Sequence, residues 1–365
     1  MGRTYFALRV VQNHGARMLF VHRPALIVAT MLALFSCQHQ TPQSDEIAAE
    51  VSPASADCRT IQHEAGETEI CGQPKRIVAL GSYTLEPLLA LNIQPVAYAD
   101  HLPIHQGDYT NPSQQIPYLG DRITQPIANV GVAYTPSVES ILKVQPDLIL
   151  GIDEMGASQY EKLSSIAPTL WLDYDRAEEN LRVIASAINH SDRASELLTK
   201  TRSQIKLARE LFSDLVLSNP NVLLLGGSEL KSIRVFTKSA GLCSSLLESL
   251  GFKLVIPPNI DKDNLARGIP ISLEALTQFN DADLVIFLGH KYSNLKSSDN
   301  VNSFEDNVLS DLKTAWKKNA IAQSLNASKV GKVYFIPTYL CAGLPGSIGT
   351  DLYLKELKRK LLLNN

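Results

Sequence analysis

Long hydrophobic runs are scarce in this sequence, and charge of either sign is sparse. Charged side chains make up 19% of the 365 residues, and 34 basic residues are nearly balanced by 37 acidic ones, for a formal charge of −3. This balance excludes the strongly basic surface of a nucleic-acid-binding protein. The hydrophobic fraction of 45% indicates a globular chain rather than a disordered one, long enough to form two lobes.

The sequence motifs of several enzyme classes are also missing. There is no G-x-S-x-G nucleophile elbow and no H-E-x-x-H zinc motif. The segment GGSELKS around Ser228 lacks the second glycine of an elbow, and no G-x-x-x-x-G-K-[ST] loop is present for ATP hydrolysis. We therefore predict no catalytic residues, with an exported two-lobed enzyme as the less favoured alternative.

The N-terminal leader has a composition of its own. Residues 1–37 contain four arginines and no acid, and the apolar run PALIVATMLALFS ends directly before Cys37. A basic start followed by a short apolar segment is typical of an export signal, and this segment is too short for a comfortable membrane span. LFSC resembles the lipobox of bacterial lipoproteins, which predicts a signal peptide over 1–37 and lipidation of Cys37. An ordinary cleaved signal and an uncleaved anchor are the alternatives, and Met18 is an alternative start.

The segment after the leader is polar and then cysteine-bearing. Residues 38–57 are rich in Pro, Ser and Ala without periodicity, which predicts a flexible tether. Four cysteines remain beyond it, and an even count in an exported protein favours disulfides. In CRTIQHEAGETEIC, a hairpin with a four-residue loop over 63–66 would set Cys58 opposite Cys71. Cys243 and Cys341 form either a second bridge or two buried thiols.

One pattern occurs twice. PSVESILKVQPDLILG begins at Pro136, and ISLEALTQFNDADLVIFLG begins at Ile271. Each contains a serine, a glutamate two residues later, a helix-patterned segment, Asp-Leu and an apolar run that ends in glycine. Short apolar runs alternate with helical periodicity around both copies, which predicts parallel sheets covered by helices.

A helical segment separates the two copies. Residues 176–217 contain almost no Gly or Pro, and a helix over 191–217 would be about 40 Å long at the rise of an α-helix. We therefore predict an α/β protein of two lobes, each with a mainly parallel sheet flanked by helices, joined by one long backbone helix. The N-terminal lobe covers 58–175, the linking helices 176–219 and the C-terminal lobe 220–365.

This organisation, together with the order of several motifs, indicates resemblance to a known protein family. The motifs are CRTIQHEAGETEICGQPKRIVALG, LEPLLALNIQPVA, YTPSVESILKVQPDLILG, SLEALTQFNDADLVIF and VGKVYFIP. From Cys58 to Leu363 the chain resembles the class III, or helical-backbone, substrate-binding proteins of ABC importers, which capture ferric siderophores, haem or cobalamin. The run CR-x-x-x-H-x-x-G-x-T resembles the ferric-siderophore branch most.

The resemblance implies a monomeric, lipid-anchored extracytoplasmic protein, in the periplasm or on the outer face of the cytoplasmic membrane. It would capture a ferric siderophore or ferric citrate-like chelate and deliver it to the ABC permease subunits. Haem or cobalamin is the alternative ligand. A chelated ferric ion is already surrounded by oxygen donors, so no cofactor and no metal-binding residues are expected of the protein itself. His101 and His105 have the spacing of a helical metal pair, but Pro103 between them disfavours the helix.

In that family a glutamate on each lobe pairs with permease arginines, and by position these are Glu139 and Glu274. Both also have a local explanation, since each lies in the first turn of a helix behind an N-capping serine, where the helix dipole favours an acid by about 0.3–1 kcal/mol. Glu86 has no counterpart at matching spacing in the other lobe, and we expect it on the surface.

The ligand site is expected in the cleft between the lobes, opposite the linking helix, on loops that follow the strands. Aromatic faces would contact a bulky chelate, and an arginine would bind a carboxylate in bidentate fashion. For any single tyrosine, packing in the core or at the rim is the commoner role. The candidates are Ser82, Tyr83, Tyr109, Tyr134, Arg234, Tyr292 and Tyr339.

Overall fold

The computed structural model describes residues 57–103, 105–257, 266–294 and 303–363. Cys37, the predicted signal peptide and nearly all of the predicted tether therefore lie outside the described residues. Within the described part of the chain, no helix has the length and apolar character needed to cross a membrane.

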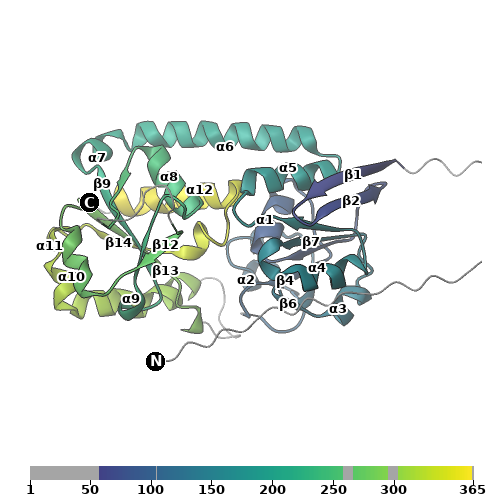
Figure 1. Ribbon diagram of the computed structural model, residues 1–365, viewed down its shortest axis with the longest axis horizontal. Coiled ribbons are helices and arrows are strands. Elements are labelled where there is room, and N and C mark those ends of the chain that lie inside the picture. Colours follow the sequence, from purple (N-terminus) through teal and green to yellow (C-terminus); the bar gives the residue numbers. More distant parts are fainter. Residues whose placement is uncertain (1–56, 104, 258–265, 295–302, 364–365) are drawn as a thin grey trace, which may run out of the picture. The chain divides into compact units, whose positions relative to one another are not determined.

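The N-terminal lobe is built on a six-stranded sheet with the order β6-β5-β4-β3-β7-β8. All neighbours are parallel except β5 and β6. The strands are β3 (Ile77–Leu80), β4 (Ala97–Asp100), β5 (Ala128–Val132), β6 (Thr135–Pro136), β7 (Leu148–Ile152) and β8 (Thr169–Leu172). The helices are α1 (Ser82–Ala90), α2 (Pro112–Gln115), η1 (Gly120–Arg122), α3 (Val138–Lys143), η2 (Asp153–Met155) and α4 (Ala157–Ser164). The first of the linking helices, α5 (Ala177–Ala187), packs against this lobe. Figure 1 shows α5 above β7 in this lobe.

A hairpin precedes this sheet and carries the first disulfide. Strands β1 (Cys58–His63) and β2 (Gly66–Cys71) pair from Cys58 opposite Cys71 to His63 opposite Gly66, and the two cysteines are joined. His63 and Gly66 thus belong to the ladder, and the loop is shorter than the predicted four residues. Gly66, with φ +119°, adopts a backbone conformation that favours glycine at the turn.

The C-terminal lobe contains the second six-stranded sheet, with the order β12-β10-β9-β13-β14 and β11 beside β9. The strands are β9 (Asn221–Gly227), β10 (Arg234–Phe236), β11 (Lys253–Leu254), β12 (Gly268–Pro270), β13 (Leu284–Gly289) and β14 (Val333–Pro337). Strands β11, β9, β13 and β14 are parallel, whereas β10 is antiparallel to both of its neighbours. The helices are η3 (Leu230–Ser232), α8 (Leu242–Leu250), η4 (Glu274–Phe279), η5 (Tyr292–Asn294), α9 (Phe304–Lys318), α10 (Ala320–Ser324), α11 (Asn326–Lys329), η7 (Thr338–Leu340) and α12 (Ser347–Leu361).

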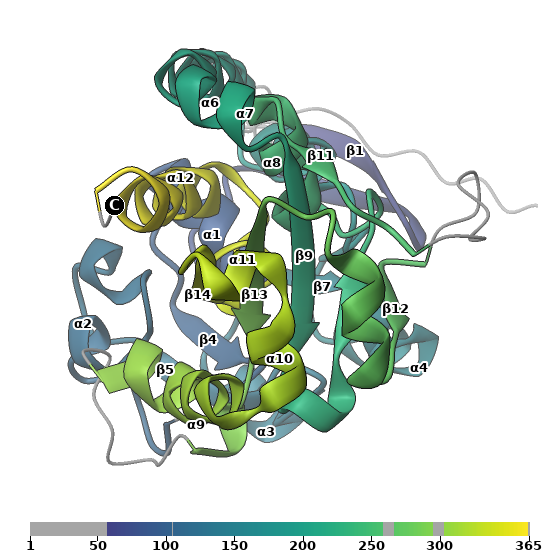
Figure 2. The same cartoon turned by 90° about the vertical axis from the view of Figure 1, so that its left-hand side faces the viewer.

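Helices cover both faces of this second sheet. Successive side chains of β9 alternate between two cores: Val222 and Leu224 pack with α8 and α12, whereas Leu223 and Leu225 pack with η4, α9 and α10. A strand buried on both faces reads as a continuous apolar run, which explains the sequence VLLL. Figure 2 shows α8 and α12 on one side of β9 and β13, and α9 and α10 on the other.

The repeated sequence occupies the same topological place in both lobes. In each lobe a short helix, α3 or η4, leads into a strand, β7 or β13, that pairs in parallel with the first strand of its sheet. The aspartate of each copy also has an equivalent role, since Asp147 accepts the backbone N–H groups of Lys75 and Arg76, and Asp283 accepts that of Asn221. The prediction of two α/β lobes on one plan is confirmed. The second helix is of the 3₁₀ type rather than α.

The linking helix is shorter than predicted. Helix α6 runs over Ser191–Leu211, about 30 Å at the rise of an α-helix, and α7 (Ser213–Ser218) follows as a separate piece. The break falls at Phe212, whose buried side chain packs against Phe252 in the C-terminal lobe. Anchoring Phe212 in that core is favoured over continuing the helix to Leu217, which is exposed. Figure 1 shows α6 running from α5 to the C-terminal lobe.

Candidate ligand-binding site

Aromatic side chains gather where the carboxyl ends of parallel strands from both lobes meet. Tyr83 follows β3, His101 follows β4 and Tyr174 follows β8, whereas Tyr292 and Tyr339 follow β13 and β14. In open parallel sheets, ligands bind outside this edge because the loops there are free to vary while the strands hold them in place. The structure brings these loops from the two lobes into contact.

The rings form a continuous chain across the two lobes. Tyr174 meets Tyr83 edge-on at 4.8 Å between centroids, and Tyr83 lies 5.4 Å from His101. His101 stacks on Tyr339 of the other lobe at 5.2 Å with an interplanar angle of 26°. From Tyr339 the chain continues through Phe304, at 5.4 Å, to Tyr292. Such pairs contribute about 0.5–1.5 kcal/mol each beyond their buried area, so this aromatic chain stabilises the contact between lobes.

The aromatic chain is largely closed to water in this structure. Burial raises the pKa of Tyr83, Tyr292 and Tyr339 far above the usual value for a phenol, and nearby Asp100 adds to the rise for Tyr292 and Tyr339. These phenols are therefore neutral hydrogen-bond donors. Among the described residues, the buried hydroxyls of Tyr98 and Tyr339 have no hydrogen-bond partner of acceptable geometry.

An arginine lies at one end of the aromatic chain. Arg267, from the segment before β12, pairs with Asp175 at 2.6 Å and with Glu154 at 3.4 Å, both from the N-terminal lobe. Its guanidinium also lies 4.3 Å from the centroid of the Tyr174 ring. A cation held between two acids and an aromatic face could exchange those acids for the carboxylates of a ligand.

The predicted contact residues divide into three groups. Ser82, Tyr83, Tyr292 and Tyr339 belong to or border the aromatic chain, and Tyr134, which is 38% exposed, lies near Tyr83 at its edge. Tyr109 packs inside the N-terminal lobe, 5.5 Å from the ring of Tyr98. Arg234 lies on β10 and donates at 2.7 Å to the carbonyl of Gly268, which is next to Arg267 in the chain, and among the described residues no ring contact includes it. Their roles in ligand binding stay predictions.

Sequence reasoning missed Arg267 and Tyr174. Tyr174 could have been found, because it follows the strand TLWL as Tyr83 follows IVAL. Arg267 carries no comparable signal, because it precedes a short antiparallel edge strand rather than following a parallel one. The two histidines considered for a metal have different partners: His101 contacts Asp100 at 3.1 Å, and His105 contacts Gln115 at 3.0 Å.

A cavity of about 870 Å³ opens on the side of the linking helix. Side chains of α6, including Leu198 and Ile205, line it together with α1, α5, α8 and the start of α12. Tyr83, Tyr174 and Arg267 lie on its wall. The prediction placed the cleft opposite the linking helix, whereas this cavity lies against that helix and shares one wall with the aromatic chain.

The two repeated glutamates are both exposed. Ser137 accepts the N–H of Ser140 at 3.2 Å, as predicted for an N-cap, and Glu139 pairs with Lys143 at 2.8 Å. This pair lowers the pKa of Glu139 below its usual value. The pKa of Glu274 is also lowered, by hydrogen bonds from its own backbone N–H and from Ser272. Glu274 forms no ion pair within the described part of the chain, and both carboxylates are ionised at neutral pH.

Glu86 corrects the prediction of a surface residue. Only 1% of it is exposed, and its carboxylate accepts hydrogen bonds from the backbone N–H groups of Gly346 and Gly349 in the other lobe. The apolar pattern of LEPLLALN did not show this contact, because the partner residues lie 260 and 263 positions further along the chain.

Two α/β lobes linked by one helix, with an aromatic site where their strand ends meet, define a two-lobed solute-binding protein. Residues 77–340 match the periplasmic binding protein family, and the chain belongs to that family. It is 28% identical to the Fe(3+)-citrate-binding protein YfmC of Bacillus subtilis, over 77% of this chain and 78% of the relative. It is 29% identical to the probable siderophore-binding lipoprotein YfiY of the same species, over 87% and 90%.

Solved structures show the same fold. SirA of Staphylococcus aureus in complex with staphyloferrin B superposes with a TM-score of 0.63 at 23% identity, covering 83% of this chain and 98% of SirA. FeuA of Bacillus subtilis with ferri-bacillibactin gives 0.62 at 20% identity, over 84% and 99%.

Proposed function

We propose that this chain is the solute-binding subunit of an ABC importer and captures a ferric siderophore or ferric citrate-like chelate. It acts outside the cytoplasm, tethered through a lipid at Cys37, as a monomer that delivers its ligand to the permease. The observation that carries the proposal is the aromatic chain with Arg267 at one end, built by loops of both lobes. Relatives named for ferric citrate and siderophore binding support it.

The chemistry of these side chains suits a chelate rather than a bare ion. Phenol and imidazole faces pack against a flat, partly apolar ligand, and Arg267 offers two N–H donors to a peripheral carboxylate. The chelator supplies the oxygen donors to iron, so the protein needs no cofactor. Haem and cobalamin are also large ligands with carboxylate or amide edges, and they remain the second candidates.

Fluorescence titration distinguishes these ligands. We expect saturable quenching of tyrosine and tryptophan emission by ferric citrate or by one ferric siderophore, and none by haem or cobalamin. Free tryptophan at equal absorbance and the iron-free chelators are the controls. Saturation by haem or cobalamin alone would show that the protein binds that ligand instead of a ferric chelate. No response to any of these ligands would favour the enzyme alternative.

Tyr339 provides a test of the aromatic chain itself. A buried hydroxyl without a partner costs about 1–3 kcal/mol, so we expect Tyr339→Phe to stabilise the unliganded protein by about 1 kcal/mol. If the hydroxyl is kept for the ligand, the same change weakens chelate binding. Urea unfolding and the quenching titration measure the two effects. Tyr353→Phe is the matched control, because that hydroxyl donates to the carbonyl of Cys243 and its loss should destabilise. Unchanged affinity in Tyr339→Phe would remove Tyr339 from the ligand site.

A further inference from the structure

Three side chains of the N-terminal lobe reach one short segment of the C-terminal lobe. Residues 341–349, called here the coupling loop, lead from η7 into the first turn of α12. Ser82 donates to the carbonyl of Gly343 at 2.6 Å, and Tyr174 donates to the carbonyl of Ala342 at 3.3 Å. The carboxylate of Glu86 accepts the N–H of Gly346 at 2.8 Å and that of Gly349 at 2.7 Å.

Glu86 is the most unusual of these contacts. Its carboxylate is buried, and none of the ion pairs found among the described residues includes it. Its charge faces instead the N-terminal N–H groups of α12, a helix of 15 residues, where the helix dipole favours an anion. Burial raises the pKa of Glu86 to about 7, while the N–H groups of Gly349 and Gly346 act in the opposite direction.

The coupling loop is shaped for this contact. A Cβ added at Gly346 would lie 3.0 Å from both carboxylate oxygens of Glu86, and one at Gly349 would overlap the carbonyl oxygen of Leu344. Only glycine at these two positions therefore lets the helix end approach the carboxylate without moving the backbone.

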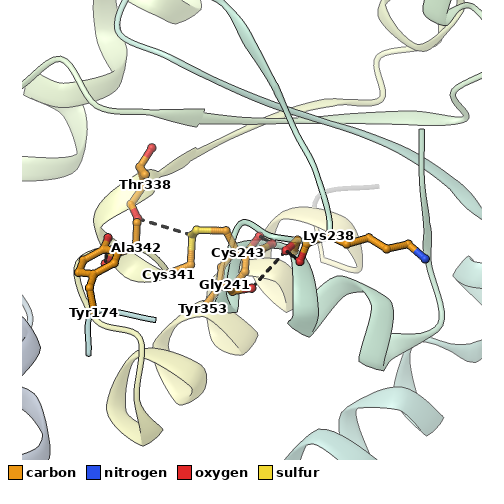
Figure 3. The surroundings of a disulfide bond; sticks show 9 residues. Tyr174, Lys238, Gly241, Cys243, Thr338, Cys341, Ala342 and Tyr353 are labelled. Carbon is orange, nitrogen blue, oxygen red and sulfur yellow. Dashed lines mark hydrogen bonds between the residues drawn. A yellow bond between two sulfur atoms is a disulfide. The ribbon is translucent and has the colours of Figure 1, made fainter. Parts of the chain in front are cut away.

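The other end of the coupling loop is held by a disulfide. Cys341 is joined to Cys243 in α8, and Tyr353 of α12 donates to the carbonyl of Cys243 at 3.3 Å. Figure 3 shows this disulfide with Tyr174 of the N-terminal lobe beside Ala342. The loop is thus tied to its own lobe at the start and to the opposite lobe along the rest of its length.

We infer that Glu86 is a positioning residue, which fixes the angle between the two lobes by binding the coupling loop. Ser82 and Tyr174 support the same contact from the candidate ligand site, so the shape of that site depends on it. Without the carboxylate, the first-turn N–H groups of α12 lose their partner in a buried place, and separation of the lobes costs less. Only the effect on ligand affinity rests on the proposed function; the effect on lobe geometry does not.

The test compares Glu86→Gln and Glu86→Ala in the full exported chain with both disulfides intact. Spin labels at Lys162→Cys on α4 and Lys318→Cys on α9 report the distance between the lobes by pulsed electron resonance. We expect the distance distribution to become about twice as broad in Glu86→Ala, with an intermediate width in Glu86→Gln. Glu69→Gln on the exposed hairpin is the matched control and should leave the distribution unchanged.

Amide hydrogen exchange completes the test. Exchange at Gly346 and Gly349 should become at least tenfold faster in both Glu86 variants, while the buried amides of β3 and β13 stay protected, as they do in an intact fold. Should Glu86→Ala not fold, the near-isosteric Glu86→Gln gives the result. Distance distributions as narrow as in the unchanged protein would overturn the inference. Weaker binding of ferric citrate at unchanged lobe distances would also overturn it, because Glu86 would then act on the ligand directly.

Discussion

We expect a chain in which Glu139 and Glu274 are both replaced by alanine to bind its ferric chelate normally and to lose most of its uptake. Both carboxylates are exposed and ionised, and neither contacts the aromatic chain. Each lies at the start of the repeated unit of its lobe, so the chain presents one acid per lobe in equivalent positions. A permease with a matching pair of arginines would form an ion pair with each lobe at the same time.

The size of the effect follows from the kind of contact. An exposed ion pair contributes about 0–1 kcal/mol alone, so each single variant should lose uptake only in part. Together the two pairs orient the protein over the permease, and we expect the double variant to lose more than tenfold in uptake rate. Because such contacts are screened, uptake by the unchanged protein should also fall as ionic strength rises.

Uptake of radioactive iron by cells that carry each variant is the measurement, with quenching titration of the purified proteins alongside. Glu161→Ala is the control, since Glu161 is an exposed acid of the N-terminal lobe outside the repeated unit. Uptake at the normal rate by the double variant would show that these glutamates serve only their local helices. A loss of chelate binding would place them in the ligand site instead.

Features set by neighbouring residues were predictable from the sequence. The repeated pattern identified β7 and β13, and the structure places both beside the first strand of their sheets. The alternation of apolar runs with helices predicted the α/β lobes because burial on both faces of a parallel sheet leaves that signature. The pairing of Cys58 with Cys71 followed from hairpin geometry in the same way.

Contacts between distant residues were not predictable. Glu86 looks like a surface acid on a short amphipathic helix until the N-terminus of α12 is placed against it. Helix α6 ends at Leu211 because Phe212 fits a pocket that only the folded C-terminal lobe provides. Arg267 joins the candidate site through acids about 90 and 113 positions earlier in the chain, a separation that no local pattern records. In each of these three cases tertiary packing determines the local structure, and the preference of the local sequence is compatible with the result.

The second large effect concerns the disulfides, which we expect to differ in their contribution to stability. Replacing Cys243 and Cys341 together by serine should lower the free energy of unfolding by about 4–5 kcal/mol, because the bridge closes a loop across a sequence separation of 98 residues. The bridge between Cys58 and Cys71 spans only 13 positions and should contribute about 3 kcal/mol.

Urea unfolding of the two double-serine variants measures this difference, and the hairpin variant is the matched control. The hairpin disulfide is exposed, whereas Cys243 and Cys341 are buried, so mild reductant should open the hairpin bridge first and leave the native lobes folded. If Cys243 and Cys341 are instead free thiols, the denatured protein will react with two equivalents of a thiol reagent before any reductant is added.

Because Cys341 begins the coupling loop that Glu86 binds, loss of its bridge should loosen the contact between lobes as well as lower stability. Unfolding free energies that are equal in the two variants would mean that the buried bridge constrains the unfolded chain no more than the hairpin bridge does.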